Sequence, residues 1–255
     1  MPNTVAVGID IGGTGIKGAI VDVTAGELLT DRKKLPTPEG GKPDDIAKTV
    51  LELVQSLGEI PASASVGICF PAVVRHGVTM SAANVSKKWI GFEAEKLFET
   101  TLGRDITFVN DADAAGFAEV RYGAAKGKSG LIILTTLGTG IGTALINNGD
   151  LIPNAELGHL EIDGVDYETK AAYSAKERED LSWKKWAERL QKYYETLEKL
   201  FSPDLFIVGG GVSKNYEDFL PLLKLDTEIV PATLRNNAGI LGAANLSTIR
   251  ATFLQ

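Results

Sequence analysis

The chain has 255 residues; 44% of them are apolar, 23% are charged, and the formal net charge is −7. This composition excludes a mostly disordered chain, and the length suffices for one large domain or two modest ones. The negative charge argues against a general nucleic-acid binder, so any site for a polyanion must be a local basic patch. The single cysteine, Cys69, excludes a disulfide framework and a cysteine-built zinc site, and we expect it to be buried.

The sequence also bears on the compartment. No stretch contains the roughly 18 apolar residues of a membrane helix. The first residues show neither the basic segment nor the long apolar segment of a secretion signal. We therefore expect a cytoplasmic protein that does not bind membranes.

A strand, a glycine loop and a second strand are predicted over 5–23, which reads VAVGIDIGGTGIKGAIVDV. Apolar residues alternate up to Ile11 and resume at Ile16. Glycines at a hairpin tip permit positive φ and remove side chains, so that successive N–H groups can face a phosphate. The candidate phosphate-binding residues of this loop are Gly12, Gly13, Thr14, Gly15 and Lys17.

Asp10 lies at the end of the first predicted strand. It is a candidate to hold Mg²⁺ through water, because that ion keeps much of its hydration shell. The alternative for the whole segment is an ordinary glycine-rich hairpin, since glycine-rich loops alone are weak signals.

The next segments lead to a loop-rich edge. A helix over 44–57 and a strand over 65–70 are predicted from their apolar spacing. Residues 71–89 show no clear period, which suits a binding edge. Within them Asn84 is a candidate sugar contact and Trp89 a candidate aromatic wall, although a plain loop fits the sequence equally well.

The pair Asn110-Asp111 is the strongest catalytic candidate. A helix over 92–102 and a strand over 106–109 precede it, and another helix follows. Ligands of α/β proteins collect at the carboxyl ends of strands, and a carboxylate there can accept the proton of a hydroxyl that attacks phosphorus. One alternative is that Asp111 only caps the following helix. Asp113 is a competing carboxylate, but its position inside the helix suits it less.

A second hairpin is predicted over 131–146, and its sequence LIILTTLGTGIGTALI repeats the design of the first. The corresponding phosphate-binding candidates are Gly138, Thr139 and Gly140. Two such hairpins indicate two related α/β halves, each offering a phosphate loop to a shared cleft. Neither loop is a P-loop, because no G-x-x-x-x-G-K-[ST] string occurs. Neither is a dinucleotide fingerprint, because a strand rather than a helix follows the glycines.

An E-x-G-H string follows in a segment, 150–180, that we expect to be irregular and polar. Its Glu156 and His159 can together bind adjacent sugar hydroxyls, and Glu168 can return to the same pocket. A metal-ligand role for His159 is the first alternative, although one histidine without cysteines makes a poor site. The second alternative is a simple surface turn.

A long helix over 182–201 has one apolar face that includes Trp183 and Trp186. These tryptophans could form a stacking site, but their helical spacing favours a core role. A strand over 205–208 then leads into Gly209, Gly210 and Gly211. At such a turn an adenosine or a phosphate can approach the backbone closely; a tight strand–helix turn is the alternative.

A short helix near 216–223, a strand near Ile229 and a last helix from about Asn237 complete the chain. Strands and helices therefore alternate along most of the sequence. This alternation predicts an α/β fold with largely parallel sheets that are covered by helices.

Taken together and in this order, these strings resemble the ROK family of sugar kinases, within the superfamily of actin-like ATPase (ribonuclease H-like) folds, over nearly the whole chain. DIGGTGIKGA and LTTLGTGIGTAL resemble its two phosphate loops, and IVGGGVS resembles its nucleotide-side glycine turn. ND resembles its catalytic pair, with Asp111 matching the general base. The residues that match its sugar-binding set are Asn84, Asn110, Asp111, Glu156, His159 and Glu168.

The resemblance implies two α/β domains around a cleft. The first would comprise residues 1–109 with a returning helix at 238–255, and the second residues 110–237. Whether the molecule is a monomer or a homodimer stays open.

The sequence departs from the family at one place. Many members follow E-x-G-H with a cysteine-rich zinc motif, whereas HLEIDGVDYETKAAYSAKEREDLSW contains no cysteine, so no structural zinc is expected. This stretch, with AANVSKKWIG, resembles the actinobacterial members that phosphorylate glucose, and in one case also mannose, from inorganic polyphosphate or ATP. The resemblance implies a hexose kinase that uses Mg²⁺, acts on the C6 hydroxyl and has Asp111 as its base. The alternative is a non-catalytic sugar-sensing or actin-like binding protein on the same fold.

A polyphosphate donor would need cations beyond the two glycine loops. The candidates are Lys17, Lys87, Lys88, Lys126 and Lys128, with Lys184, Lys185, Arg189 and Lys192 as weaker ones. For each of them the alternative is a solvated surface charge.

Overall fold

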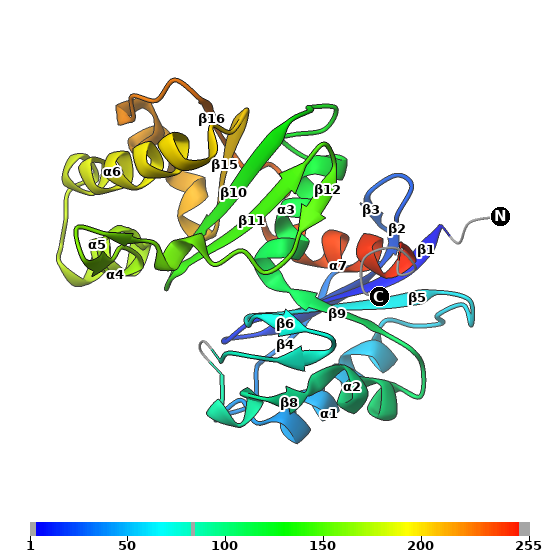
Figure 1. The fold of residues 1–255 in the computed structure, drawn as a ribbon. Helices are drawn as coiled ribbons and strands as arrows, with labels where there is room; N and C mark the ends of the chain where they lie inside the picture. The colour runs from blue at the N-terminus through cyan, green and yellow to red at the C-terminus, as the bar shows by residue number, and fades with distance from the viewer. Residues whose placement is uncertain (1–3, 83–84, 250–255) are drawn as a thin grey trace. The chain divides into compact units, whose positions relative to one another are not determined.

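The computed structural model describes residues 4–82 and 85–249 (Figure 1). Contacts within the chain divide it into two compact units, one formed by Met1–Ala118 with Asn236–Gln255 and the other by Glu119–Arg235. The first division falls inside helix α3 (Asp111–Tyr122), whereas the sequence-based boundary lies just before that helix. No helix among the described residues is both long and apolar enough to cross a membrane.

The first unit is built on a mixed sheet with the strand order β3-β2-β1-β5-β9, in which β4 also pairs with β2. The strands are β1 (Val5–Ile11), β2 (Ile16–Asp22), β3 (Glu27–Leu28), β4 (Lys33–Leu35), β5 (Ser65–Phe70) and β9 (Thr107–Asn110). β1 is antiparallel to β2 and parallel to β5, which is parallel to β9. The register pairs Asp10 with Cys69 and Cys69 with Val109. The carboxyl ends of β1, β5 and β9 therefore meet at one edge, where ligands of α/β sheets collect.

Helices α1 (Pro43–Ser56) and α2 (Ala94–Leu102) pack on this sheet in the main apolar core of the first unit. Helix α7 (Ala238–Thr248) packs against β1 and β5. The expected helix over 44–57 and strand over 65–70 are both confirmed, because their apolar periods match their buried faces.

Short elements occupy 71–93, where we expected a loop over 71–89 and the start of a helix at Phe92. They are β6 (Val74–Arg75), β7 (Val78–Thr79), the short helix η1 (Lys87–Trp89) and β8 (Phe92–Glu93). Trp89 is fully buried, stacks on Phe98 and donates its Nε1–H to the Gly41 carbonyl at 2.8 Å. The suggestion of an aromatic wall is therefore wrong: this indole belongs to the core of the unit.

The second unit repeats the hairpin-and-strand plan, in the order β12-β11-β10-β15-β16. The strands are β10 (Leu131–Leu137), β11 (Ile141–Asn147), β12 (Asp150–Ile152), β15 (Leu205–Gly209) and β16 (Glu228–Pro231). β10 is antiparallel to β11 and parallel to β15, just as β1 is to β2 and β5. The internal repeat predicted from the two glycine strings is thus present in the sheets as well.

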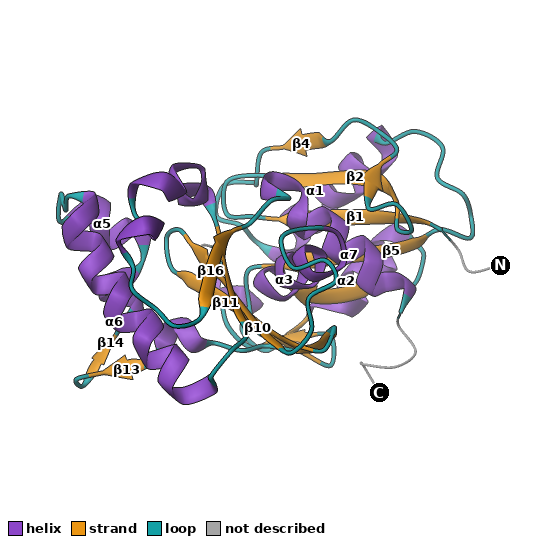
Figure 2. Ribbon diagram, turned by 90° about the horizontal axis from the view of Figure 1, so that it is seen from above, coloured by secondary structure: helices purple, strands orange, loops and turns teal. Residues whose placement is uncertain are grey.

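Helix α6 (Trp183–Phe201) packs on this second sheet. Ser182 accepts a hydrogen bond from the Lys185 N–H, as expected of a cap, and Trp186 is fully buried. The stripe of aromatic residues on α6 is therefore core. The β13–β14 hairpin (Glu161–Ile162, Val165–Asp166) lies beside α6, where Lys192 forms an ion pair with Asp163 (Figure 2).

Residues 150–180 are more regular than we expected. Besides β12 and the β13–β14 hairpin they contain the short helices η2 (Leu157–His159), α4 (Glu168–Ala171) and α5 (Tyr173–Arg178). Elements this short show no recognisable period. Side chains from α5 and α6 hydrogen-bond to the backbone carbonyls of α4.

Candidate active site

The first glycine hairpin joins β1 to β2. Lys17 is paired with Asp10 in the register, and its Nζ lies 2.9 Å from Asp10 Oδ2. The Gly12 N–H donates to the Gly15 carbonyl at 3.0 Å, which closes the loop, and Gly13 and Thr14 at its tip are exposed. The loop thus brings together the residues that the sequence assigned to phosphate binding.

Of the two properties that we expected glycine to supply here, this loop does not use positive φ. None of Gly12, Gly13 and Gly15 has a positive φ. A Cβ at Gly15 would lie 2.6 Å from the Cε of Lys34, so any other residue here would have to displace the Lys34 side chain.

Strand β4 and the segment after it bring two residues to this loop, Lys34 and Thr37, that sequence reasoning missed. Lys34 pairs with Lys17 across β2 and β4, and its exposed side chain passes over Gly15. The Thr37 hydroxyl donates to the Gly12 carbonyl at 2.5 Å. No local pattern signals this arrangement, since it depends on a pairing between β2 and a three-residue strand.

Cys69 lies on the other side of Asp10. Its Sγ is 3.8 Å from Asp10 Oδ1 and 3.6 Å from the Gly239 carbonyl, and the residue is fully buried as expected. Burial raises the pKa of the Cys69 thiol well above its usual value, and the carboxylates of Asp10 and Asp111 raise it further. The thiol therefore stays protonated and contacts the Asp10 carboxylate as a weak donor.

Asn110 has the capping role that we considered as the alternative for Asp111. Asn110 is buried; its Oδ1 accepts the Asp113 N–H at 3.0 Å and its Nδ2 donates to the Ala72 carbonyl at 3.0 Å. Asn110 therefore caps α3. Asp111, the first residue of α3, is half-buried, and its Oδ1 accepts the N–H of Ala112 at 2.8 Å. Asp113 is only 2% exposed, which disfavours it as the carboxylate that meets a substrate.

The second glycine hairpin joins β10 to β11. The Gly138 N–H donates to the Gly140 carbonyl at 3.0 Å, and the Ile141 N–H donates to Glu168 Oε2 at 2.7 Å. A Cβ at Gly140 would collide with the Glu168 carboxylate. Glu168 is therefore built into the wall of this loop, a contact that the sequence did not predict.

The other polar residues of the E-x-G-H segment gather near Glu168. His159 Nδ1 lies 2.9 Å from Asp166 Oδ2, while Asp166 Oδ1 accepts the Glu168 N–H at 3.2 Å. Asp166 thus links the imidazole to the second glycine loop; sequence reasoning missed it because a lone aspartate in a polar hairpin carries no motif.

Glu156, His159 and Glu168 lie close enough for their charges to contribute to the pKa shifts of Glu156 and His159. The hydrogen bond to Asp166 raises the pKa of His159, and the charges of Glu168 and Glu156 add to that effect. Desolvation raises the pKa of Glu156, with Glu168 acting in the same direction and His159 opposing it. Asn84, the remaining candidate for sugar binding, lies outside the described residues.

The third glycine turn follows β15. Gly210 has φ +84° and approaches the backbone of Leu137, and its carbonyl accepts hydrogen bonds from the N–H and the hydroxyl of Ser213 at 3.1 and 2.9 Å. This is the tight turn that we considered, and it leads from Gly209 into the short helix η3 (Gly211–Asp218). The turn also packs against Leu137, the last residue of β10, which leads into the second glycine loop.

Several of the candidate cations are already paired. Lys128 forms an ion pair with Glu228 at 3.1 Å, Arg189 with Glu179 at 2.6 Å, and Lys192 with Asp163. The weaker candidates on α6 thus include two with a structural role. Lys87 and Lys88 lie in η1, where Ser86 accepts a hydrogen bond from the Lys88 N–H.

Comparison with known proteins shows the family of this chain. Residues 6–172 match the model of the ROK family. The chain is 49% identical over 246 residues to a polyphosphate glucokinase of Mycobacterium tuberculosis, an alignment that covers 96% of this chain and 92% of that one.

Two solved structures are also similar. An inorganic polyphosphate/ATP-glucomannokinase from Arthrobacter sp. strain KM is 52% identical, with a TM-score of 0.92 and coverage of 97% of this chain and 100% of that chain. A ROK family glucokinase from Streptomyces griseus, solved with glucose and AMPPNP, is 25% identical, with a TM-score of 0.80 and coverage of 95% and 99%. These similarities confirm the expected α/β fold of the actin-like ATPase class. The chain belongs to the ROK family.

Proposed function

We propose that this protein is a hexose kinase that transfers the terminal phosphoryl group of inorganic polyphosphate or ATP to the C6 hydroxyl of glucose. The observation that carries the proposal is the position of Asp111, a half-buried carboxylate where β9 ends, in a unit that also holds a glycine hairpin with Lys17. The names of the relatives at 49% and 52% identity support the sugar and the donors.

In the proposed reaction, Asp111 accepts the proton of the sugar hydroxyl as its oxygen attacks the terminal phosphorus of the donor. The new O–P bond forms while the bridging P–O bond breaks, and the shortened polyphosphate or ADP leaves with that electron pair. The N–H groups of the two glycine loops and the ammonium of Lys17 stabilise the negative charge of the transferring group.

The candidate residue for Mg²⁺, Asp10, suits a contact through water rather than a site built from several protein ligands. Among the described residues no cluster of three or more His, Cys, Asp or Glu side chains could hold a metal ion. Asp10 is one carboxylate, 18% exposed and paired with Lys17, which fits a water-mediated contact to an ion held mainly by donor phosphates. When bound there, Mg²⁺ would neutralise phosphate charge.

The sugar is proposed to bind through the acidic and imidazole side chains around the E-x-G-H segment. Glu156 would accept a hydrogen bond from one hydroxyl, and His159 would contact its neighbour. Glu168 would accept a hydrogen bond from a sugar hydroxyl through Oε1, because its Oε2 already accepts the Ile141 N–H. Asn84 and Asn110 remain candidates from the resemblance, although both polar atoms of the Asn110 side chain are used within the first unit.

The donor is proposed to meet Gly12, Gly13, Thr14, Gly15 and Lys17 in the first unit and Gly138, Thr139 and Gly140 in the second. Gly209, Gly210 and Gly211 are proposed for the nucleotide of ATP. Lys34 extends the positive charge of the first loop.

A coupled assay tests the proposal. Purified protein is given glucose or mannose with Mg²⁺, and polyphosphate and ATP are offered separately. We expect hexose 6-phosphate with both donors; a folded protein that forms none would favour a non-catalytic sugar-binding role.

A further inference from the structure

We propose that Ser174 is a positioning residue that holds the second glycine loop in the form that binds the phosphoryl donor. Its backbone N–H donates to the Gly138 carbonyl at 3.0 Å, and its hydroxyl donates to the Thr139 carbonyl at 2.6 Å. The inference rests on the proposed function, because it assigns a partner to a loop proposed to bind phosphate.

All three carbonyls of this loop accept hydrogen bonds. Ser174 donates to the carbonyls of Gly138 and Thr139, and the Gly138 N–H donates to the Gly140 carbonyl. Among the residues that the structure describes, no group accepts a hydrogen bond from the N–H of Thr139 or of Gly140. The loop therefore keeps its acceptors turned to the protein and retains two donors, which is the arrangement that a phosphate requires.

Glu168 holds the loop from its other side. Its Oε2 accepts the Ile141 N–H at 2.7 Å, directly after Gly140. The loop thus lies between a carboxylate on α4 and a hydroxyl on α5. Since α4 and α5 are consecutive, the position of this short segment sets the position of both contacts.

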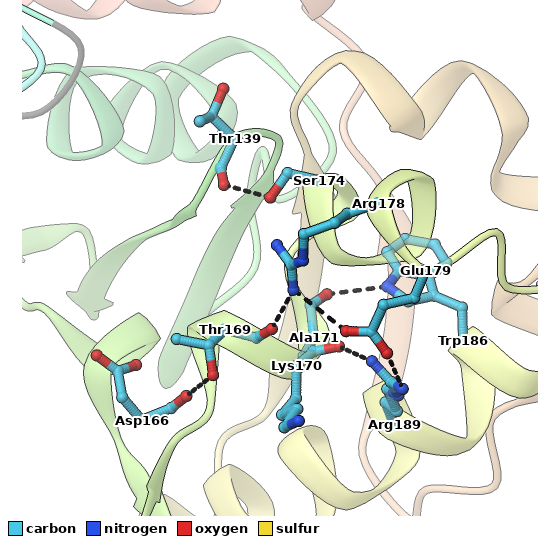
Figure 3. Close-up of polar contacts among 10 residues, drawn as sticks. All are labelled: Thr139, Asp166, Thr169, Lys170, Ala171, Ser174, Arg178, Glu179, Trp186 and Arg189. Carbon is cyan, nitrogen blue, oxygen red and sulfur yellow. Dashed lines mark hydrogen bonds and ion pairs between the residues drawn. The ribbon is translucent and has the colours of Figure 1, made fainter.

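Side chains from α5 and α6 anchor α4 (Figure 3). A four-residue helix leaves its last carbonyls without intrahelical partners. Here the carbonyls of Thr169, Lys170 and Ala171 accept hydrogen bonds, in that order, from Arg178 at 2.9 Å, Arg189 at 3.1 Å and Trp186 at 3.0 Å.

Glu179 joins the two arginines of this anchor, because its carboxylate oxygens lie 3.2 Å from Arg178 and 2.6 Å from Arg189. The indole of Trp186, which is fully buried, fixes the third contact from inside the core. The buried side of α6 is thus connected through α4 and α5 to the loop carbonyls. A loop fixed in this way does not need to reorganise when a phosphate arrives, which is how preorganised N–H donors act.

The test compares Ser174→Ala with Ser174→Thr, which keeps the hydroxyl. We expect Ser174→Ala to raise the KM for polyphosphate and for ATP by about 3- to 10-fold, the effect of one hydrogen bond, and to change the KM for glucose by less than about twofold. kcat should change less than the donor KM, because the N–H groups of this loop contact the donor phosphates in the ground state as well as in the transition state. Ser174→Thr should restore most of the donor affinity.

The matched control is Ser56→Ala, which removes a hydroxyl-to-carbonyl hydrogen bond of 2.7 Å at the end of α1. It should leave every KM unchanged. Donor KM values unchanged in Ser174→Ala, or a glucose KM that rises as much as the donor KM, would overturn the inference.

Calorimetry with tripolyphosphate separates this inference from the proposed function, since it needs no turnover. We expect Ser174→Ala to weaken tripolyphosphate binding by the same 3- to 10-fold. If the native protein binds tripolyphosphate but phosphorylates no hexose, the proposed function fails and the comparison of the Ser174 variants still decides the inference. If the native protein does not bind tripolyphosphate, or if both variants bind it as the native protein does, the inference is wrong.

Discussion

Asp166 Oδ2 lies 2.9 Å from the Nδ1 atom of His159. This contact orients the imidazole and leaves its Nε2 as the nitrogen that can reach a ligand. Because the other oxygen of Asp166 accepts the Glu168 N–H, one aspartate fixes two of the residues proposed to bind sugar.

The first prediction concerns pH. The hydrogen bond to Asp166 raises the pKa of His159, so the imidazolium persists to a higher pH than usual, and the stability of the charged pair is lost as the pH rises through that raised pKa. We expect Asp166→Asn to lower the pKa of His159, measured by NMR titration of the ring protons. His76, the other histidine of the chain, is the internal control. An unchanged His159 titration would show that the contact does not set its charge.

The second prediction concerns sugar affinity. Glu156→Gln and His159→Ala should each raise the KM for glucose by about tenfold or more, the effect of losing a hydrogen bond to a charged group, and raise the donor KM less. Glu161→Gln, an exposed carboxylate in the neighbouring β13, is the matched control. Calorimetric glucose binding that stays the same in both variants would assign the E-x-G-H segment another role.

The third prediction concerns the donor. Polyphosphate carries about one charge per phosphate over a long chain, so it gains more than ATP from cations beside the loops. We expect Lys34→Ala to lower kcat/KM for polyphosphate several-fold more than for ATP, and the polyphosphate reaction to be the more sensitive to salt. Lys48→Ala, an exposed lysine on α1, should affect neither donor.

The double variant Lys126→Ala with Lys128→Ala extends this comparison. Its effect on polyphosphate should be smaller than that of Lys34→Ala, because Lys128 already faces Glu228 at 3.1 Å. Equal losses for both donors at every salt concentration would mean that polyphosphate uses only the phosphate subsites of ATP.

Much of the fold could be predicted because its central elements have strong local signals. The strand over 65–70, SVGICF, is mostly apolar, and the repeated Gly-Thr-Gly-Ile string marks both hairpins. The paired strands β4, β13 and β14 have two or three residues each, too few for a period to appear.

The site could be predicted only in part, for the same physical reason. Asp10, Lys17 and Glu168 stood out through motifs, and the structure brings the first two together. Lys34, Asp166 and Ser174 act through non-local contacts, each with a loop or residue that no spacing in the sequence connects to it. The capping role of Asn110 was not predicted; capping was considered only as an alternative for Asp111, because either side chain can cap a helix.

The most direct test of the central claim is the turnover of Asp111→Asn, measured beside its affinity for glucose. The substitution keeps the shape of the side chain but removes the proton acceptor, so kcat should fall by about 10² or more with either donor, while calorimetry still detects glucose binding. Asp44→Asn, an exposed acid in the first turn of α1, should retain full activity. A folded Asp111→Asn protein with near-native kcat would contradict the account, because the proton of the sugar hydroxyl would then go to another group.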